Sequence, residues 1–202
     1  MKKIIILLAL FILLCASAFA QEESDFKILN GFILSYEGND TDIVIPAQIN
    51  GMSVTGISEK AFSNKRLTSV IIPDGVIVIE EYSFAFNKLR TVTIPDSVTT
   101  IGEGAFYYNE LTSINLGNSI RIIKASAFCE NRLRNIVIPE SVTEINQCAF
   151  WANPLERITI GANVALEKEY YEVFVFGFDD DYESNKKRAG TYIYRNRSWS
   201  IQ

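Results

Sequence analysis

Hydrophobic and polar residues alternate along this chain in a pattern that repeats every 22 residues. Four copies follow one another without a gap, at residues 67–88, 89–110, 111–132 and 133–154. Leucine opens each copy, and Leu155 opens a partial fifth. An earlier copy covers about residues 43–66 and carries five extra residues around Asn50-Gly51. Self-similarity at such a period is typical of a solenoid, in which each copy stacks on its neighbours to bury a continuous core.

Each copy predicts the same succession of local structures. Positions 4 and 6 are apolar between mostly polar neighbours, which indicates a short strand with one buried face. Proline or glycine at position 7 ends the strand, since proline cannot donate to a sheet. The apolar spacing then lengthens to three, which favours a tighter turn. An Ala-Phe pair at positions 17 and 18 predicts a helical turn that buries a large ring, and an asparagine at position 21 is expected to bond backbone groups between copies.

Both ends of the repeat region predict β-hairpins. Phe26–Leu29 and Phe32–Tyr36 flank Asn30-Gly31, a strong signal for a two-residue hairpin turn. At the other end the repeat is lost from Glu167 onward, and alternating aromatic residues around 191–201 predict a second hairpin. We interpret both hairpins as caps, because the end coils of a solenoid would otherwise be open. The C-terminal aromatic residues could instead form a contact surface or join copies into a homo-oligomer.

The first twenty residues have the order of a secretory signal peptide. Two lysines precede an unbroken apolar run over residues 4–14, and small residues at Ala18 and Ala20 precede a polar segment. The apolar run is shorter than the roughly 20 residues that a membrane-spanning helix needs. We therefore predict export, cleavage after Ala20 and no transmembrane span in the mature chain. Leu13-Leu14-Cys15 faintly resembles a lipid-attachment motif, but Leu14 is larger than the residue usual there, so anchoring at Cys15 is less favoured.

The sequence accordingly divides into four parts. We assign residues 1–20 to the signal peptide and residues 21–42 to an N-terminal β cap. We assign residues 43–166 to the repeats of about 22 residues and residues 167–202 to a C-terminal aromatic β cap.

Segments such as LRTVTIPDSVTTIGEGAF and LRNIVIPESVTEINQCAF resemble BspA-type leucine-rich repeats, also called the Treponema pallidum-type class. The resemblance covers about residues 43–166. It implies an α/β repeat solenoid, a right-handed curved stack with a parallel sheet on one face and small β-hairpin caps at both ends. It also implies a bacterial surface or envelope protein that binds a protein ligand and mediates attachment to host or other cells. A periplasmic structural or assembly protein that binds partners within its own envelope is the alternative.

The amino-acid composition argues against several classes of function. The 202 residues include 24 acidic and 19 basic side chains, a net charge of −5, which disfavours binding to nucleic acid. There is no histidine, so nucleophilic arrangements of the Ser-His-Asp or Cys-His kind are excluded. We predict no enzymatic activity and no cofactor or metal. The acidic run 179–183 could supply oxygen ligands to calcium, but it lacks EF-hand spacing and lies beside a basic run, so we interpret it as a solvated loop.

Candidate partner-binding residues lie at two places in the repeat. The outward strand positions 3 and 5 carry Ser69, Ile71, Thr91, Thr93, Ser113, Asn115, Asn135, Val137, Arg157 and Thr159. A second set follows the phenylalanine position and comprises Tyr107, Tyr108 and Trp151. For these aromatic residues, packing between coils is the alternative to partner binding. Cys129 and Cys148 occupy different repeat positions, and the sequence does not decide whether they pair.

Overall fold

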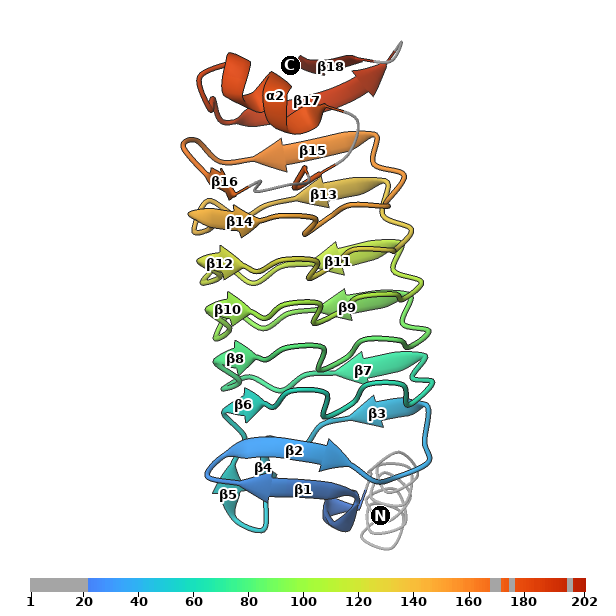
Figure 1. Cartoon of the computed structure of the whole chain (residues 1–202). Helices are drawn as coiled ribbons and strands as arrows, with labels where there is room; N and C mark the ends of the chain where they lie inside the picture. The colour runs from blue at the N-terminus through green and yellow to red at the C-terminus, as the bar shows by residue number, and fades with distance from the viewer. Residues whose placement is uncertain (1–21, 168–171, 175–176, 196–197) are drawn as a thin grey trace, which may run out of the picture.

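The computed structural model describes residues 22–167, 172–174, 177–195 and 198–202. The predicted signal peptide and Cys15 lie outside these residues. The described chain winds into an elongated stack of coils with a hairpin at each end, as Figure 1 shows. Within the described residues, no helix has the length and apolar character that crossing a membrane requires.

The outward-facing strand predicted for each copy is confirmed. These strands form one column along the stack, composed of β3 (Asp42–Val44), β7 (Ser69–Ile71), β9 (Thr91–Thr93), β11 (Ser113–Asn115), β13 (Asn135–Val137) and β15 (Arg157–Ile160). The strands pair in parallel two by two, β3 with β7, β9 with β11 and β13 with β15. Repeat positions are in register in each pair, so that Ile114 lies beside Val92 and Ile158 beside Ile136. The central residue of each strand faces the core, and its two neighbours face solvent in most coils.

A second column of strands replaces the tight turn that the sequence predicted. Its eight-stranded sheet contains β1 (Phe26–Leu29), β2 (Phe32–Tyr36), β6 (Gly56–Ile57), β8 (Val78–Ile79), β10 (Thr100–Ile101), β12 (Ile122–Ile123), β14 (Glu144–Asn146) and β16 (Ala165–Glu167). All neighbours from β2 to β16 pair in parallel. Four of these strands, β6, β8, β10 and β12, are two residues long, too short to show alternation in the sequence. They form because coils in register bring equivalent backbone groups together, and buried backbone groups must pair.

The third side of each coil consists of turns, so the predicted helical turn at the Ala-Phe pair is wrong. Positions 16 and 20, which flank that pair, have a positive φ in each full coil, and a right-handed helix cannot contain such residues. The phenylalanine is nevertheless buried as predicted. Its rings stack from coil to coil with centroid separations of 4.9 to 5.4 Å, through Phe62, Phe84, Phe106, Phe128, Phe150 and Phe174.

The asparagine at position 21 bonds backbone groups of its own and the preceding coil, as the sequence predicted. Asn87 donates from Nδ2 to the carbonyl oxygens of Phe62 and Phe84 at 2.9 Å. Its Oδ1 accepts from the backbone N–H groups of Leu67 and Lys65 at 2.9 and 3.1 Å. Equivalent bonds recur at Asn109, Asn131 and Asn153.

Hairpins close both ends of the stack. The turn between β1 and β2 has a positive φ at both Asn30 and Gly31, as a type I′ turn requires. The extra residues of the first copy form a further hairpin, β4 (Gln48–Ile49) with β5 (Met52–Ser53). A single 3-10 turn, η1 (Glu23–Asp25), precedes β1.

At the C-terminal end, β17 (Gly190–Arg195) pairs antiparallel with β15, and β18 (Ser198–Ile201) pairs with β17. The acidic run differs from the solvated loop that the sequence predicted. It lies within helix α2 (Phe178–Ser184), and Asp179 is buried. The Asp179 carboxylate accepts hydrogen bonds from the N–H groups of Val173 and Phe174 at 2.5 and 3.2 Å, which fixes the segment against the last coil.

Candidate functional site

The predicted strand-face residues line the outer side of the first column. Ile71 and Val137 are the most apolar members, with exposed fractions of 57% and 65%. A shallow hollow of about 380 Å³ lies over β7 and β9. Thr159 is less exposed than Ile71 and Val137. It is half-buried, because the C-terminal hairpin covers it and its hydroxyl group forms a hydrogen bond of 2.9 Å with that of Thr191. The face is therefore open over the middle coils and closed at β17.

The predicted aromatic residues lie on the turn side of the stack. Tyr108 and Trp151 are 58% and 45% exposed, and Tyr107 is half-buried. The structure adds Phe86, which is 46% exposed, and the half-buried Tyr82, neither of which the sequence analysis singled out.

Four of these rings form one group, which we name the aromatic cluster: Tyr82, Phe86, Tyr107 and Tyr108. The edge of one ring faces the plane of the other in the pairs Tyr107–Phe86 at 5.3 Å and Tyr107–Tyr82 at 6.5 Å. Tyr108 lies 5.9 Å from Phe86. Burial is the main cause that raises the pKa of Tyr82 and of Tyr107, so both phenols stay neutral hydrogen-bond donors at physiological pH.

Three of these aromatic residues have a left-handed backbone conformation, with φ values of 50° at Tyr82, 59° at Phe86 and 54° at Tyr108. The coil imposes this conformation at positions 16 and 20, where other coils carry smaller or more flexible residues: Lys60, Asn64, Gly104, Ser126, Glu130, Cys148 and Ala152. A positive φ is unfavourable for a bulky side chain. Such strain concentrates at functional sites, where a side chain is retained for what it contacts. The aromatic cluster is therefore a stronger candidate for binding than exposure alone indicates.

A hollow of about 520 Å³ lies on one side of the cluster. Its lining includes Lys60, Tyr82, Trp151, Cys129 and Cys148. Both cysteines are free thiols. Burial, and then the neighbouring Cys148, raises the pKa of Cys129 to about 12, so its thiol is protonated at neutral pH. Burial also raises the pKa of Cys148.

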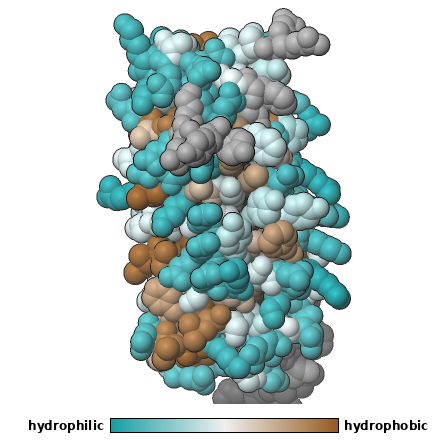
Figure 2. Space-filling model, viewed as in Figure 1, coloured by the Kyte–Doolittle hydropathy of each residue, from teal (hydrophilic) through white to brown (hydrophobic). Residues whose placement is uncertain are grey.

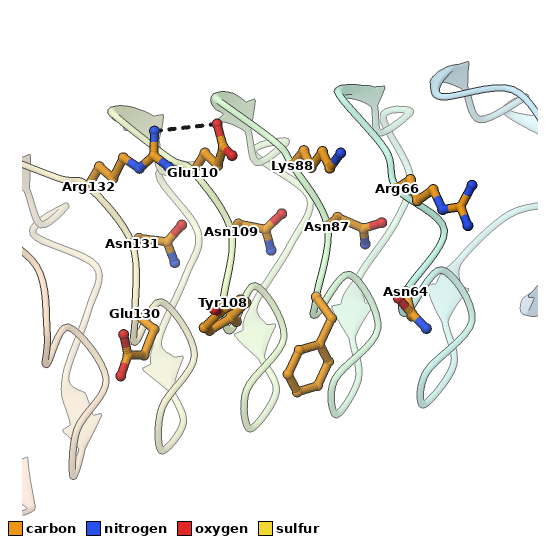
Figure 3. Close-up of a pocket in the computed structure, with 11 residues that line it drawn as sticks. Asn64, Arg66, Asn87, Lys88, Tyr108, Asn109, Glu110, Glu130, Asn131 and Arg132 are labelled. Atoms are coloured by element: carbon orange, nitrogen blue, oxygen red, sulfur yellow. Dashed lines mark ion pairs between the residues drawn. The ribbon is translucent and has the colours of Figure 1, made fainter.

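On the other side lies a cavity of about 550 Å³ that runs along the stack, which we name the trough. Figure 3 shows its two walls and its floor. Charged side chains at position 22 follow one wall: Arg66, Lys88, Glu110 and Arg132. Position 20 supplies the opposite wall: Asn64, Phe86, Tyr108 and Glu130. The floor is the asparagine ladder: Asn87, Asn109 and Asn131.

Among the described residues, no three His, Cys, Asp or Glu side chains come together in a way that could hold a metal ion. The candidate sites described above are the strand face, the aromatic cluster and the trough.

Comparison with known proteins agrees with the coil geometry. The model of the BspA type leucine-rich repeat region matches residues 55–172 in six copies, more than half of the chain. The chain belongs to the BspA-type leucine-rich repeat family. Leucine-rich repeat solenoids of this kind are typically non-enzymatic scaffolds for protein interaction.

Solved structures of bacterial leucine-rich repeat proteins share the fold. A Treponema pallidum leucine-rich repeat protein is 24% identical with a TM-score of 0.61, covering 70% of this chain and 71% of that one. The pneumococcal vaccine antigen PcpA is 24% identical with a TM-score of 0.54, over 61% of this chain and 31% of its own. A Eubacterium ventriosum protein is 22% identical with a TM-score of 0.53, over 74% and 42%. The chain thus spans less than half the length of two of these three proteins. No curated protein matches.

Proposed function

We propose that this BspA-type protein is an exported, non-enzymatic module that binds a protein ligand and attaches its cell to host tissue or to other cells. The observation that carries the proposal is the aromatic cluster. Its most exposed rings, Phe86 and Tyr108, take a strained backbone conformation and make large apolar contact surfaces. Exposed aromatic residues of this kind dominate the energy of protein interfaces.

The face drawn in Figure 2 is compatible with the same proposal. Most of its side chains are hydrophilic, and hydrophobic ones gather in a few groups. The coils are joined by the eight-stranded sheet, by the paired strands of the first column, by the ring stack and by the asparagine ladder, so the cluster is held rigidly before any partner arrives. A preorganised surface binds more tightly because it has less conformational entropy to lose. The strand face is the second candidate surface, since Ile71, Thr91, Thr93 and Asn115 lie open to solvent.

The test is binding of purified residues 21–202 to immobilised extracellular-matrix proteins and to envelope fractions of the producing cell. A turn-face variant carries Phe86→Asn and Tyr108→Asn, because asparagine accepts the left-handed conformation without strain. A strand-face variant carries Thr91, Thr93, Ser113 and Asn115 changed to glutamate. We expect the turn-face variant to bind a matrix protein at least tenfold more weakly, and the strand-face variant to bind within twofold of wild type.

The opposite ranking would assign recognition to the strand face. Binding to no matrix protein, with binding only to the cell's own envelope fraction, would replace attachment by the alternative role, a periplasmic structural or assembly protein. Protease treatment of intact cells separates the two locations independently, because a surface protein is digested and a periplasmic one is protected.

A further inference from the structure

The floor of the trough offers a ligand little hydrogen-bonding capacity, because its asparagines are buried and bonded to backbone groups. Asn109 donates from Nδ2 to the carbonyl oxygens of Phe84, Phe106 and Tyr107, and its Oδ1 accepts from the N–H of Leu89. Asn87 makes equivalent donations, and its Oδ1 accepts from the N–H groups of both Lys65 and Leu67. A ligand must therefore be recognised mainly by the walls. This disfavours a neutral sugar, whose hydroxyl groups need many donors and acceptors around them.

The charged wall changes character along its length. At one end Glu110 is neutralised, because its Oε2 lies 3.4 Å from Nη1 of Arg132 and 3.9 Å from Nε of Arg90. At the other end Arg66 and Lys88 are exposed, and neither forms an ion pair with any described residue. These two unpaired cations on adjacent coils make this part of the surface positively charged, although the net charge of the chain is −5. They suit carboxylate groups of a partner.

The opposite wall offers apolar contact that is offset by one coil from these cations. Phe86 lines the trough on the coil that carries Lys88, and Tyr108 lines it on the next coil, which carries Glu110. The trough crosses four coils, and neighbouring coils are about 4.8 Å apart as in any sheet, which gives roughly 14 Å. An extended peptide rises about 3.3 Å per residue, so four or five residues fill this length. Because successive side chains of an extended chain point in opposite directions, one side can meet the cations while the other meets the rings.

We propose that the trough binds an extended peptide segment of a partner protein in which acidic and apolar side chains alternate. The acidic groups pair with Arg66 and Lys88, and the apolar groups pack on Phe86 and Tyr108. The proposal rests on the protein-binding function above and names the chemistry of the partner.

The test uses residues 21–202 and a fluorescein-labelled decapeptide whose central five residues are Asp-Phe-Glu-Leu-Asp, with fluorescence anisotropy as the readout. A matched peptide carries Asn and Gln in place of the acids. The variant is Arg66→Glu with Lys88→Glu. The control is Arg121→Glu with Lys124→Glu, which makes the same change in net charge at exposed cations outside the trough. We expect the acidic peptide to bind wild type and the control within threefold, and to bind the trough variant at least tenfold more weakly.

We also expect the amide peptide to bind wild type at least tenfold more weakly, and added salt to weaken binding of the acidic peptide. Equal loss in the trough variant and the control would overturn the proposal, because it would reduce the effect to net charge. Binding of a sialylated trisaccharide in place of the peptide would overturn it in favour of an anionic glycan. Peptide binding that is absent from wild type, while matrix binding in the panel above persists, would reject this ligand and leave the proposed function intact. Peptide binding with no matrix binding would support this ligand and reject the proposed attachment to host tissue.

Discussion

Replacing an asparagine of the ladder by alanine should lower the free energy of unfolding by different amounts in different coils, although these asparagines occupy the same position of the repeat. Each Nδ2 bonds carbonyl oxygens in its own and the preceding coil, so most of these oxygens have two donors. The carbonyl oxygen of Phe84 accepts from both Asn87 and Asn109, and that of Phe106 accepts from both Asn109 and Asn131. Removal of one asparagine therefore leaves a shared oxygen still bonded.

Asn109→Ala leaves one buried group without a partner, the N–H of Leu89. The third carbonyl that Asn109 contacts, that of Tyr107, keeps the bond from the N–H of Phe86. An orphaned buried donor costs about 1–3 kcal/mol, and the lost hydrogen bonds add about 1 kcal/mol. We expect the free energy of unfolding to fall by about 2–4 kcal/mol.

Asn87→Ala should cost more, because Asn87 is the first member of the ladder. Its position in the preceding coil is occupied by Lys65, so the carbonyl oxygen of Phe62 has no second donor. The variant orphans this oxygen and the buried N–H of Leu67, while the half-buried N–H of Lys65 can turn to water. Two buried orphans raise the expected loss to about 4–5 kcal/mol.

The assay is urea unfolding of residues 21–202 followed by circular dichroism, with the free energy obtained by linear extrapolation. Asn115→Ala is the control, since Asn115 is exposed on the strand face, and it should change stability by less than about 0.5 kcal/mol. Equal losses for Asn87→Ala and Asn109→Ala would refute the argument, because they would mean that sharing of carbonyl oxygens does not determine the cost.

Three further changes test other parts of the fold. Phe106→Ala removes a fully buried ring stacked between two others, and thermal melts should report a loss of about 3–5 kcal/mol; a loss under 1 kcal/mol would contradict the ring stack. Gly117→Ala would drive a Cβ into the carbonyl oxygen of Pro95 and should cost about 1–3 kcal/mol, whereas an unchanged melting temperature would show that the coil can shift. Burial raises the pKa of Cys129 to about 12, above the ordinary thiol value of about 8.5. The stability that its protonated thiol contributes is fully present below pH 8.5 and is lost as the pH rises from about 8.5 to about 12. The melting temperature of Cys129→Ala should therefore fall less steeply with pH over that range than that of wild type. An unchanged dependence of melting temperature on pH would contradict this.

The parts of the fold that the sequence predicted are those in which one residue type is required at one position of every coil. Leucine at position 1, phenylalanine at position 18 and asparagine at position 21 each occupy a buried place that only a side chain of that shape or hydrogen-bonding capacity fills. The β1–β2 turn was predictable for a similar local reason, since Asn30-Gly31 accepts a positive φ at both residues. The boundaries assigned to the two caps stay a prediction.

The second strand column was not predictable from local pattern. Strands such as Val78–Ile79 and Thr100–Ile101 are two residues long and exist because six coils stack in register. The burial of Asp179 could not be predicted from the sequence for a related reason. A run of acidic residues ordinarily faces water, and only the tertiary structure brings the N–H groups of Val173 and Phe174 to this carboxylate.

The sequence identified only part of the candidate site, because packing in the core does not restrict which residues occupy the outward positions of a repeat. Tyr108 was found as an aromatic residue outside the core pattern, but Phe86 and Tyr82 were missed. A signal for them existed. Once the coil is known to require a left-handed residue at positions 16 and 20, any bulky aromatic residue there conflicts with local preference. Conflicts of this kind are expected where function opposes stability, so comparing each coil's residues at these two positions is a way to search other solenoids of this family for binding surfaces.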